Sequence, residues 1–223
     1  MKIVAAKKIL KANDQLAQEN RAAWDAAGVF GVNIVGSPGC GKTTLLEAVF
    51  GRLKGRFSPA VIEGDIAGSI DAQRIDALGV PVVQINTDGA CHLDAAMIAA
   101  AAGDLDLPGL QLLVIENVGN LVCTAGFDLG ERLRLVVLSV TEGDDKLVKY
   151  PAIFQASQCL VVTKIDLLPY TNFDFARASA DMKRLNPTAD IFQVSAKTGE
   201  GIPALAEWLC DRVTAGRQTR PGA

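Results

Sequence analysis

One glycine-rich segment constrains the fold of this chain more than any other feature. Its eight residues, which match the pattern GxxxxGK[ST], are Gly36, Ser37, Pro38, Gly39, Cys40, Gly41, Lys42 and Thr43. A hydrophobic run at 29–35 precedes it and a helical pattern at 44–53 follows it, as a phosphate-binding loop between a strand and a helix requires. In such a loop backbone N–H groups surround the phosphates, a lysine reaches the β- and γ-phosphates, and a hydroxyl binds Mg²⁺. We therefore predict that these residues and Thr44 bind a nucleotide, with Lys42 in a catalytic role and Thr43 on Mg²⁺.

The composition is that of one globular domain with an appendage. The chain has 223 residues, 49% of them hydrophobic, and Lys+Arg 22 against Asp+Glu 25 give a net charge of −3. This near-neutral balance argues against a nucleic-acid partner, and no apolar run approaches the roughly 18–20 residues of a membrane span. The lysine-flanked start lacks the pattern of a secretory signal. Five cysteines without a Cys-x-x-Cys pair make a poor disulfide framework, so we expect a cytoplasmic protein with no membrane contact.

Short β-rich runs alternate with helical stretches from residue 29 onward. The expected strands are 29–35, 60–63, 81–85, 112–116, 135–140, 160–163 and 191–194. The expected helices are 44–53, 71–78, 93–102, 175–185 and 203–213. Such alternation predicts an α/β fold of three layers, a P-loop NTPase with a mostly parallel central sheet. We divide the chain into an N-terminal amphipathic helix packed on the domain (1–27), a main domain identified below as a GTPase (28–215) and a flexible tail (216–223).

Acidic residues close two of the expected strands. Asp65 and Glu116 each follow a hydrophobic run. Ligands of parallel α/β sheets bind beyond the carboxyl ends of the strands, where a carboxylate can hold Mg²⁺ or orient an attacking water. We assign both residues catalytic and Mg²⁺-binding roles, and we expect Gly119 to offer its N–H to a γ-phosphate. Glu63 is left open between such a role and a solvated strand end.

Two further elements follow hydrophobic runs and indicate guanine. The first is the sequence Thr163-Lys164-Ile165-Asp166. It resembles the NKxD element of GTPases, in which the aspartate accepts hydrogen bonds from N1–H and the exocyclic amine of guanine, a donor pair that adenine lacks. Here Thr163 replaces the usual asparagine. The second, which resembles the last base-binding element of GTPases, is Ser195-Ala196-Lys197. We expect Lys164, Asp166 and residues 195–197 to bind GTP or GDP.

The single histidine and two of the cysteines form a candidate metal site. His92 follows Cys91 directly, and Cys123 lies just after the proposed γ-phosphate contact. Thiolate and imidazole suit Ni²⁺, Zn²⁺ or copper ions better than Mg²⁺. Adjacent residues tend to point apart and three ligands leave a coordination position open, so a site completed across a two-fold interface is one solution. The alternative is packing cysteines and a satisfied polar histidine. We predict that Cys159 and Cys210, which lie in hydrophobic patterns, are core residues.

With these motifs assembled, the chain resembles the HypB family over nearly its whole length. This family consists of metallochaperone GTPases of the SIMIBI class that assist nickel insertion into [NiFe]-hydrogenase. The segments that carry the resemblance are 36–47, 63–65, 91–94, 116–123, 127–130, 139–143 and 166–170. The unbroken run 116–123 is the most specific of them, whereas a phosphate loop alone is common to many NTPases.

The resemblance implies slow hydrolysis of GTP to GDP and phosphate by a homodimer that forms with GTP. It also implies that Cys91, His92 and Cys123 bind Ni²⁺ or Zn²⁺ at the dimer interface. Delivery would be to the hydrogenase large subunit, together with a small HypA-like zinc/nickel protein. Asn120 stands where Ras-like enzymes place a water-orienting glutamine, which favours slow turnover. Since His92 is the only histidine, we expect transient handling of nickel and no store.

Two other functions stay open at this point. A urease-type nickel GTPase similar to UreG has ligands in the order Cys-Pro-His, and the absence of a proline between Cys91 and His92 favours the HypB family. A signalling GTPase with structural cysteines would bind no nickel. Metal binding by Cys91 and Cys123 therefore distinguishes a carrier from a signalling protein.

Overall fold

A seven-stranded parallel sheet forms the centre of the protein among the residues that the structure describes, 6–66 and 68–218, with the backbone alone for 6–9. In this computed structural model the strands are β1 (Phe30–Gly36), β2 (Pro59–Asp65), β3 (Val82–Asn86), β4 (Leu112–Glu116), β5 (Leu133–Ser139), β6 (Cys159–Thr163) and β7 (Asp190–Gln193). Their spatial order is β3-β2-β4-β1-β5-β6-β7, and every neighbouring pair is parallel. All carboxyl ends therefore lie along one edge of the sheet.

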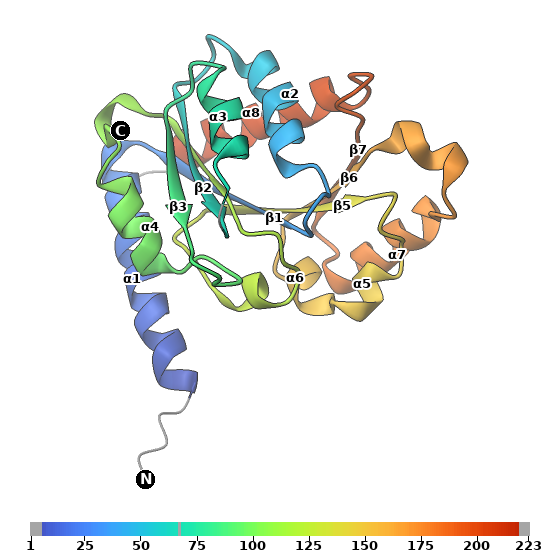
Figure 1. Ribbon diagram of the computed structural model, residues 1–223, viewed down its shortest axis with the longest axis horizontal. Coiled ribbons are helices and arrows are strands. Elements are labelled where there is room, and N and C mark those ends of the chain that lie inside the picture. The colour runs from blue at the N-terminus through green and yellow to red at the C-terminus, as the bar shows by residue number, and fades with distance from the viewer. Residues whose placement is uncertain (1–5, 67, 219–223) are drawn as a thin grey trace.

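Helices cover both faces of this sheet (Figure 1). They are α1 (Ala6–Ala27), α2 (Lys42–Leu53), α3 (Ile70–Asp76), α4 (Ala95–Ala102), α5 (Lys146–Lys149), α6 (Pro151–Gln155), α7 (Phe175–Leu185) and α8 (Ile202–Gln218). Short 3₁₀ helices are η1 (Leu107–Gly109), η2 (Cys123–Gly126) and η3 (Ile165–Tyr170). The helices α2, α3 and α8 pack on one face, and the other face is covered by α1 and α4 over one half and by α5, α6 and α7 over the other. The predicted three-layer P-loop fold is confirmed.

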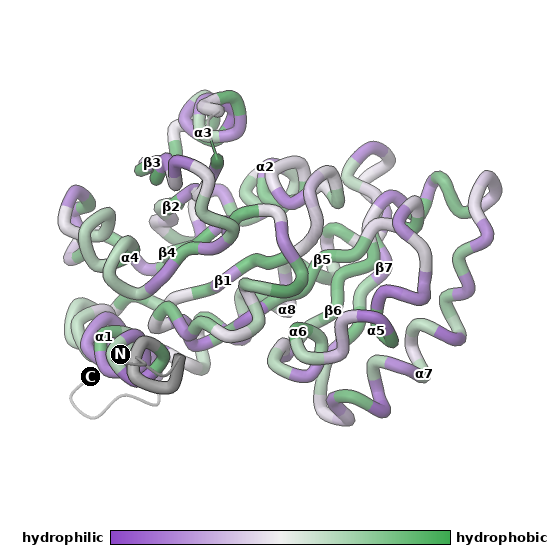
Figure 2. Tube along the Cα trace, turned by 60° about the horizontal axis from the view of Figure 1, so that its bottom comes forward, coloured by the Kyte–Doolittle hydropathy of each residue, from purple (hydrophilic) through white to green (hydrophobic). Residues whose placement is uncertain are grey.

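The central strands are apolar because both of their faces are covered. Every residue of β1, β4, β5 and β6 is buried. Figure 2 shows hydrophobic residues along β5 and β6, whereas α7 alternates hydrophilic and hydrophobic residues. Strands buried on two faces read as nearly continuous hydrophobic runs, whereas a helix on the surface needs an apolar stripe only.

The seven expected strands are all present, with shifts of one or two residues at most ends. The expected helix at 93–102 begins later, at Ala95, because the side chain of Asp94 accepts the N–H of Met97 and caps the first turn. The expectation had no helix between β5 and β6, where α5 and α6 lie. The break between them is at Pro151, the first residue of α6, which cannot donate a backbone hydrogen bond to α5.

The N-terminal helix α1 lies on the main domain beside α4 (Figure 1). Trp24 is 2% exposed and its ring lies over Gly31 of β1, where a Cβ would stand 2.7 Å from the ring. Asn20 donates to the backbone carbonyls of Ala95 and Leu129, at 2.9 and 3.1 Å. Residues 1–5 of the predicted helical segment lie outside the described residues.

The last helix runs into the segment 216–223 that the sequence predicts to be a flexible tail. α8 continues to Gln218 because Gly216 packs on the ring of Phe30 and Arg217 donates to the carbonyl of Gly28 at 3.0 Å. Residues 219–223 lie outside the described residues. Within the described part of the chain, no helix has the length and apolar character needed to cross a membrane.

Replacing Trp24 by alanine tests how α1 is attached. We expect Trp24→Ala to lower the free energy of unfolding by about 3–5 kcal/mol, because the ring is buried against a glycine and its removal leaves a cavity. Chemical denaturation measures this change. The control is Leu10→Ala on the same helix, where the side chain is 37% exposed and the change should stay within about 0.5 kcal/mol. Equal effects of the two variants would contradict the docked position of α1.

Candidate nucleotide and metal sites

The phosphate loop lies at the carboxyl edge of the sheet, between β1 and the first turn of α2. Gly41 precedes α2 with a φ of 95°, a left-handed conformation that glycine adopts without strain. A Cβ on Gly36 would stand 2.6 Å from the carbonyl oxygen of Val137, so this position excludes a side chain. Lys42 and Thr43 begin α2 and are 8% and 5% exposed. The loop therefore has the geometry of an anion site at a helix N-terminus.

Two adjoining cavities lie over this loop. The first, of about 380 Å³, is lined among others by Lys42, Thr43, Asp65, Glu116 and Gly119. The second, of about 400 Å³, is lined among others by Thr163, Asp166, Ala196 and Lys197. Residues that line both are Gly41, Thr44 and Lys164. Most of the predicted nucleotide contacts, which are far apart in the sequence, thus line one continuous pair of cavities.

Four of the predicted nucleotide contacts line neither of these two cavities, namely Gly36, Ser37, Cys40 and Ser195. Cys40 is fully buried beneath the loop, and burial raises the pKa of its thiol to about 11. Its side chain is thus an uncharged packing group of the loop. Ser195 is buried too, and its hydroxyl donates to the Asp166 carboxylate at 2.7 Å, so it orients Asp166 from outside the cavity.

Two side chains at the end of β6 form hydrogen bonds with the phosphate loop. The hydroxyl of Thr163 donates to the carbonyl of Cys40 at 2.7 Å. Lys164 has a φ of 59°, and its ammonium group donates to the carbonyl of Gly39 at 2.6 Å. Thr163, which departs from the usual asparagine, therefore still connects the base-binding segment with the phosphate loop.

A pair of buried carboxylates stands at the ends of β2 and β4. Glu63 and Glu116 are direct partners in the register of the two strands, and each is 3% exposed. The hydroxyl of Thr43 donates to Oε1 of Glu116 at 2.7 Å, whereas Oε2 of each glutamate has no hydrogen-bond partner. Burial, with the negative charges of Glu116 and Asp65, raises the pKa of Glu63 to about 8. The sequence left a solvated strand end open for Glu63, and that alternative is wrong.

The same corner has the ligand chemistry of a magnesium site. Burial raises the pKa of Glu116, and the positive charge of Lys42 opposes this rise. Asp65 accepts the N–H groups of Ile66 and Gly68, at 2.6 and 3.0 Å, which fixes its carboxylate at the mouth of the first cavity. The hydroxyl of Thr43 and the carboxylates of Asp65 and Glu116 are hard oxygen donors, and Oε2 of Glu116 is buried with no hydrogen-bond partner, so the three residues fit Mg²⁺.

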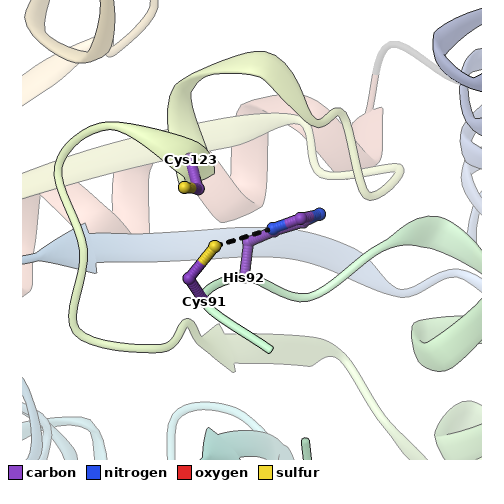
Figure 3. Close-up of side chains that lie close together, drawn as sticks. All are labelled: Cys91, His92 and Cys123. Carbon is purple, nitrogen blue, oxygen red and sulfur yellow. Dashed lines mark hydrogen bonds between the residues drawn. The ribbon is translucent and has the colours of Figure 1, made fainter. Parts of the chain in front are cut away.

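Cys91, His92 and Cys123 come together in one chain. One ligand atom from each lies within 4.8 Å of the others, and Sγ of Cys91 is 3.5 Å from Nδ1 of His92 (Figure 3). The expectation that adjacent residues point apart is wrong here, because residues 91–92 form a bend before α4 and not a strand or helix. A hydrogen bond with Cys91 raises the pKa of the Cys123 thiol. Two sulfurs and an imidazole form the kind of set that binds Ni²⁺ or Zn²⁺.

Three residues to which the sequence reasoning gave no role hold this cluster. The ring of His92 stacks on Phe127, with centroids 3.9 Å apart. Leu93, which follows, packs on Gly64 of β2, where a Cβ would be 2.7 Å from its Cδ1. Arg134 donates to the carbonyl of Phe127 at 2.7 Å and forms a buried ion pair with Glu131. A glycine between two acidic residues and a buried arginine in a strand are the signals that could have found them.

Cys159 and Cys210, which the sequence predicts to be core residues, are both buried, at 0% and 1% exposed. Burial raises the pKa of each thiol. None of the five cysteines forms a disulfide, and all five lie in the described part of the chain.

Comparisons with known proteins agree on one family. Residues 31–193 match the CobW/HypB/UreG, nucleotide-binding domain family. Hydrogenase maturation factor HypB of Escherichia coli (strain K12) is 50% identical over 201 residues, which are 90% of this chain and 69% of that protein. A probable hydrogenase maturation factor HypB of Methanocaldococcus jannaschii is 43% identical over 204 residues, 92% of each chain. The crystal structure of HypB from Helicobacter pylori in complex with nickel has a TM-score of 0.88 at 36% identity, covering 95% of this chain and all of that one.

The raised pKa of Glu63 predicts a stability change with pH. In the unfolded chain this carboxyl loses its proton as the pH rises above its ordinary pKa of 4.5. The folded, nucleotide-free protein keeps the proton up to about pH 8. The folded state then binds more protons, so the free energy of unfolding falls as the pH rises through that window. We expect Glu63→Gln to flatten the fall and to be more stable than the parent at pH 8 by roughly 1–3 kcal/mol.

Denaturant unfolding with EDTA and without nucleotide measures this effect across the window. Glu19→Gln is the control, because Glu19 is an exposed glutamate on α1 and should leave the pH dependence unchanged. The same slope for Glu63→Gln and the parent would show that Glu63 ionises normally in the folded protein.

Proposed function

The chain belongs to the HypB group of the CobW/HypB/UreG family, and from this premise we propose that it hydrolyses GTP and carries nickel for [NiFe]-hydrogenase maturation. The observation that carries the proposal is the convergence of Cys91, His92 and Cys123 beside the loop that lines the phosphate cavity. It is supported by a HypB that was crystallised in complex with nickel. A signalling GTPase has no need of such a ligand set, so we favour a carrier.

GTP would occupy the two cavities, with its phosphates over the glycine-rich loop and its base against Asp166. Lys42 would stabilise negative charge on the transferring phosphoryl group. Thr43, Glu116 and Asp65 would hold Mg²⁺, which when bound neutralises charge on the β- and γ-phosphates. A carboxylate at this edge would also orient the attacking water, since Glu116 and Asp65 both line the cavity.

We expect intrinsic hydrolysis to be slow. Asn120, at the position of the water-orienting glutamine in Ras-like enzymes, uses its amide oxygen to accept the N–H groups of Val122 and Cys123, at 2.7 and 3.0 Å. That oxygen is therefore engaged within the loop and does not face a water in the cavity. A slow cycle suits a carrier, because the bound nucleotide then sets a state that lasts until a partner is met.

A homodimer that closes with GTP is part of the proposal. Three hydrophobic side chains near these sites are exposed. Ile66 lines the first cavity and is 50% exposed, Ile70 precedes the cavity residue Asp71 and is 73% exposed, and Val122 precedes Cys123 and is 61% exposed. Covering them with a second copy of the chain would remove apolar surface from water. The partners we propose for transfer are a small HypA-like protein and the hydrogenase large subunit. We place this exchange in the cytoplasm, where free thiols such as Cys91 stay reduced.

Nickel binding tests the carrier directly. We expect Cys91→Ala and Cys123→Ala each to lower the affinity for Ni²⁺ by roughly tenfold or more, because each removes one of three ligands. Equilibrium dialysis with Ni²⁺ and with Zn²⁺ measures the affinity, and mass determination with GDP and with a non-hydrolysable GTP analogue measures the dimer. Cys210→Ala is the matched control, since Cys210 is buried in α8 and its loss should leave metal binding unchanged. Unchanged binding in the Cys91 and Cys123 variants would reject the site.

Base recognition gives a separate test. We expect Asp166→Asn to weaken GTP binding by roughly 10- to 100-fold, because the amide offers one acceptor where the carboxylate offers two. Binding of ATP, which lacks the paired donors, should change little. Competition of both nucleotides against a fluorescent GDP derivative measures the two affinities. If Asp166→Asn keeps the parent's preference for GTP over ATP, Asp166 does not select the base.

A further inference from the structure

One short segment, Asn117 to Asn120, lies between the phosphate cavity and the metal ligands. Asn117, Val118 and Gly119 line that cavity. A Cβ on Gly119 would stand 2.8 Å from the backbone nitrogen of Pro38, so the segment is in contact with the phosphate loop. Asn120 forms an antiparallel bridge with Gly36 at the start of the same loop. Any shift of the phosphate loop or of Gly119 must therefore move this segment.

Asn117 connects the segment to the first two ligands. Its side chain is 1% exposed, and its Oδ1 accepts the N–H of Leu93 at 3.3 Å and the N–H of Val118 at 3.0 Å. Leu93 follows Cys91 and His92 directly in the chain. A single buried oxygen thus holds together the turn at the phosphate cavity and the bend that carries two ligands. Losing such an acceptor would leave buried N–H groups without a partner, which is costly.

Asn120 makes the equivalent connection to the third ligand. Its Oδ1 accepts the N–H of Cys123 itself, at 3.0 Å, and its backbone carbonyl accepts the hydroxyl of Thr124 at 2.6 Å. These bonds fix the start of η2 relative to the residue that bridges to the phosphate loop. The two asparagines lie on either side of Gly119 in the sequence. Asn117 is linked to the bend that carries Cys91 and His92, and Asn120 is linked to Cys123.

We infer that Asn117 and Asn120 are positioning residues that make the nickel affinity depend on the bound nucleotide. The inference rests on the proposed function, since it takes GTP and nickel as the ligands. Metal sites require ligand atoms within about 0.2 Å of their ideal distances, and a hydrogen bond tolerates little stretching. When Gly119 meets a γ-phosphate, its movement is passed by one amide oxygen to Cys91 and His92 and by the other to Cys123, so the spacing of the three ligands changes.

The test measures the dissociation constant of Ni²⁺ with Mg²⁺ and GDP, and again with Mg²⁺ and a non-hydrolysable GTP analogue, and takes the ratio. Competition with a coloured chelator gives the constants, and the absorption of the nickel–thiolate bond reports the ligand geometry in each state. We expect the ratio in the parent protein to depart from one by roughly 5- to 150-fold, the usual size of coupling between two sites. In Asn117→Ala and Asn120→Ala the ratio should fall towards one and the two absorption spectra should become alike.

A conservative variant and a matched control complete the test. Asn120→Asp keeps an acceptor oxygen for the N–H of Cys123 and should keep the ratio of the parent. Asn186, which follows α7, donates a hydrogen bond of comparable length, 2.9 Å, to the carbonyl of Ser157. Asn186→Ala removes this bond and should also keep the ratio. Failure of Asn120→Asp to restore the ratio, or its loss in Asn186→Ala, would overturn the inference, because an acceptor-specific link predicts neither.

The failures of the two proposals are distinguishable. A ratio of one in the parent protein would reject the nucleotide-dependent carrier and this inference with it. A ratio well away from one in the parent that persists in both alanine variants would reject the positioning role alone. All constants are measured at a nucleotide concentration that saturates each variant, so a change in the ratio reports the link between the two sites and not a loss of bound nucleotide.

Discussion

The proximity of Glu63 and Glu116 is the constraint on which the site depends. Parallel pairing places the two residues in register at the ends of β2 and β4, and both are buried. Two carboxylates so close in a poorly solvated place resist being ionised together, and a proton on Glu63 relieves the repulsion in the nucleotide-free protein. A bound divalent cation would also relieve it. The acidic corner therefore favours a bound cation. The ammonium group of Lys42 alone is not enough, because it lowers the pKa of Glu63 and still leaves it at about 8.

The topology of the sheet explains why the nucleotide site and the metal cluster are neighbours. β4 lies between β1 and β2, so the segment that leaves β4 after Glu116 passes over the phosphate loop that follows β1. The bend at 91–92, before α4, is drawn to the same place because Leu93 packs on Gly64 of β2. Gly64 stands between Glu63 and Asp65, so one strand end carries two acidic side chains and, between them, the gap that Leu93 fills. Neither site could be moved without rebuilding the other.

The sheet and the phosphate loop were predictable because their signals are local. A strand buried on both faces is a hydrophobic run, and a glycine-rich loop with Lys42 has a fixed spacing. Helices α5 and α6 were missed because a helix of four or five residues is too short to show a period of 3.6. The burial of Glu63 and the convergence of Cys91 with Cys123 depend on contacts between segments far apart in the chain, which no local pattern contains.

The two proposed metal sites differ in ligand chemistry, and this difference would let one small domain bind both ions at separate places. Thr43, Glu116 and Asp65 offer only hard oxygen atoms, whereas the cluster of Cys91, His92 and Cys123 offers sulfur and nitrogen. Nickel binds most ligand sets more tightly than magnesium does, so affinity alone would not keep nickel from the nucleotide site. The proposed cluster of sulfur and nitrogen ligands would solve this by competing for nickel within the same molecule, which would leave the oxygen site to magnesium. Three protein ligands would leave a coordination position for an incoming ligand, so transfer of a bound ion could begin before it had left its first site.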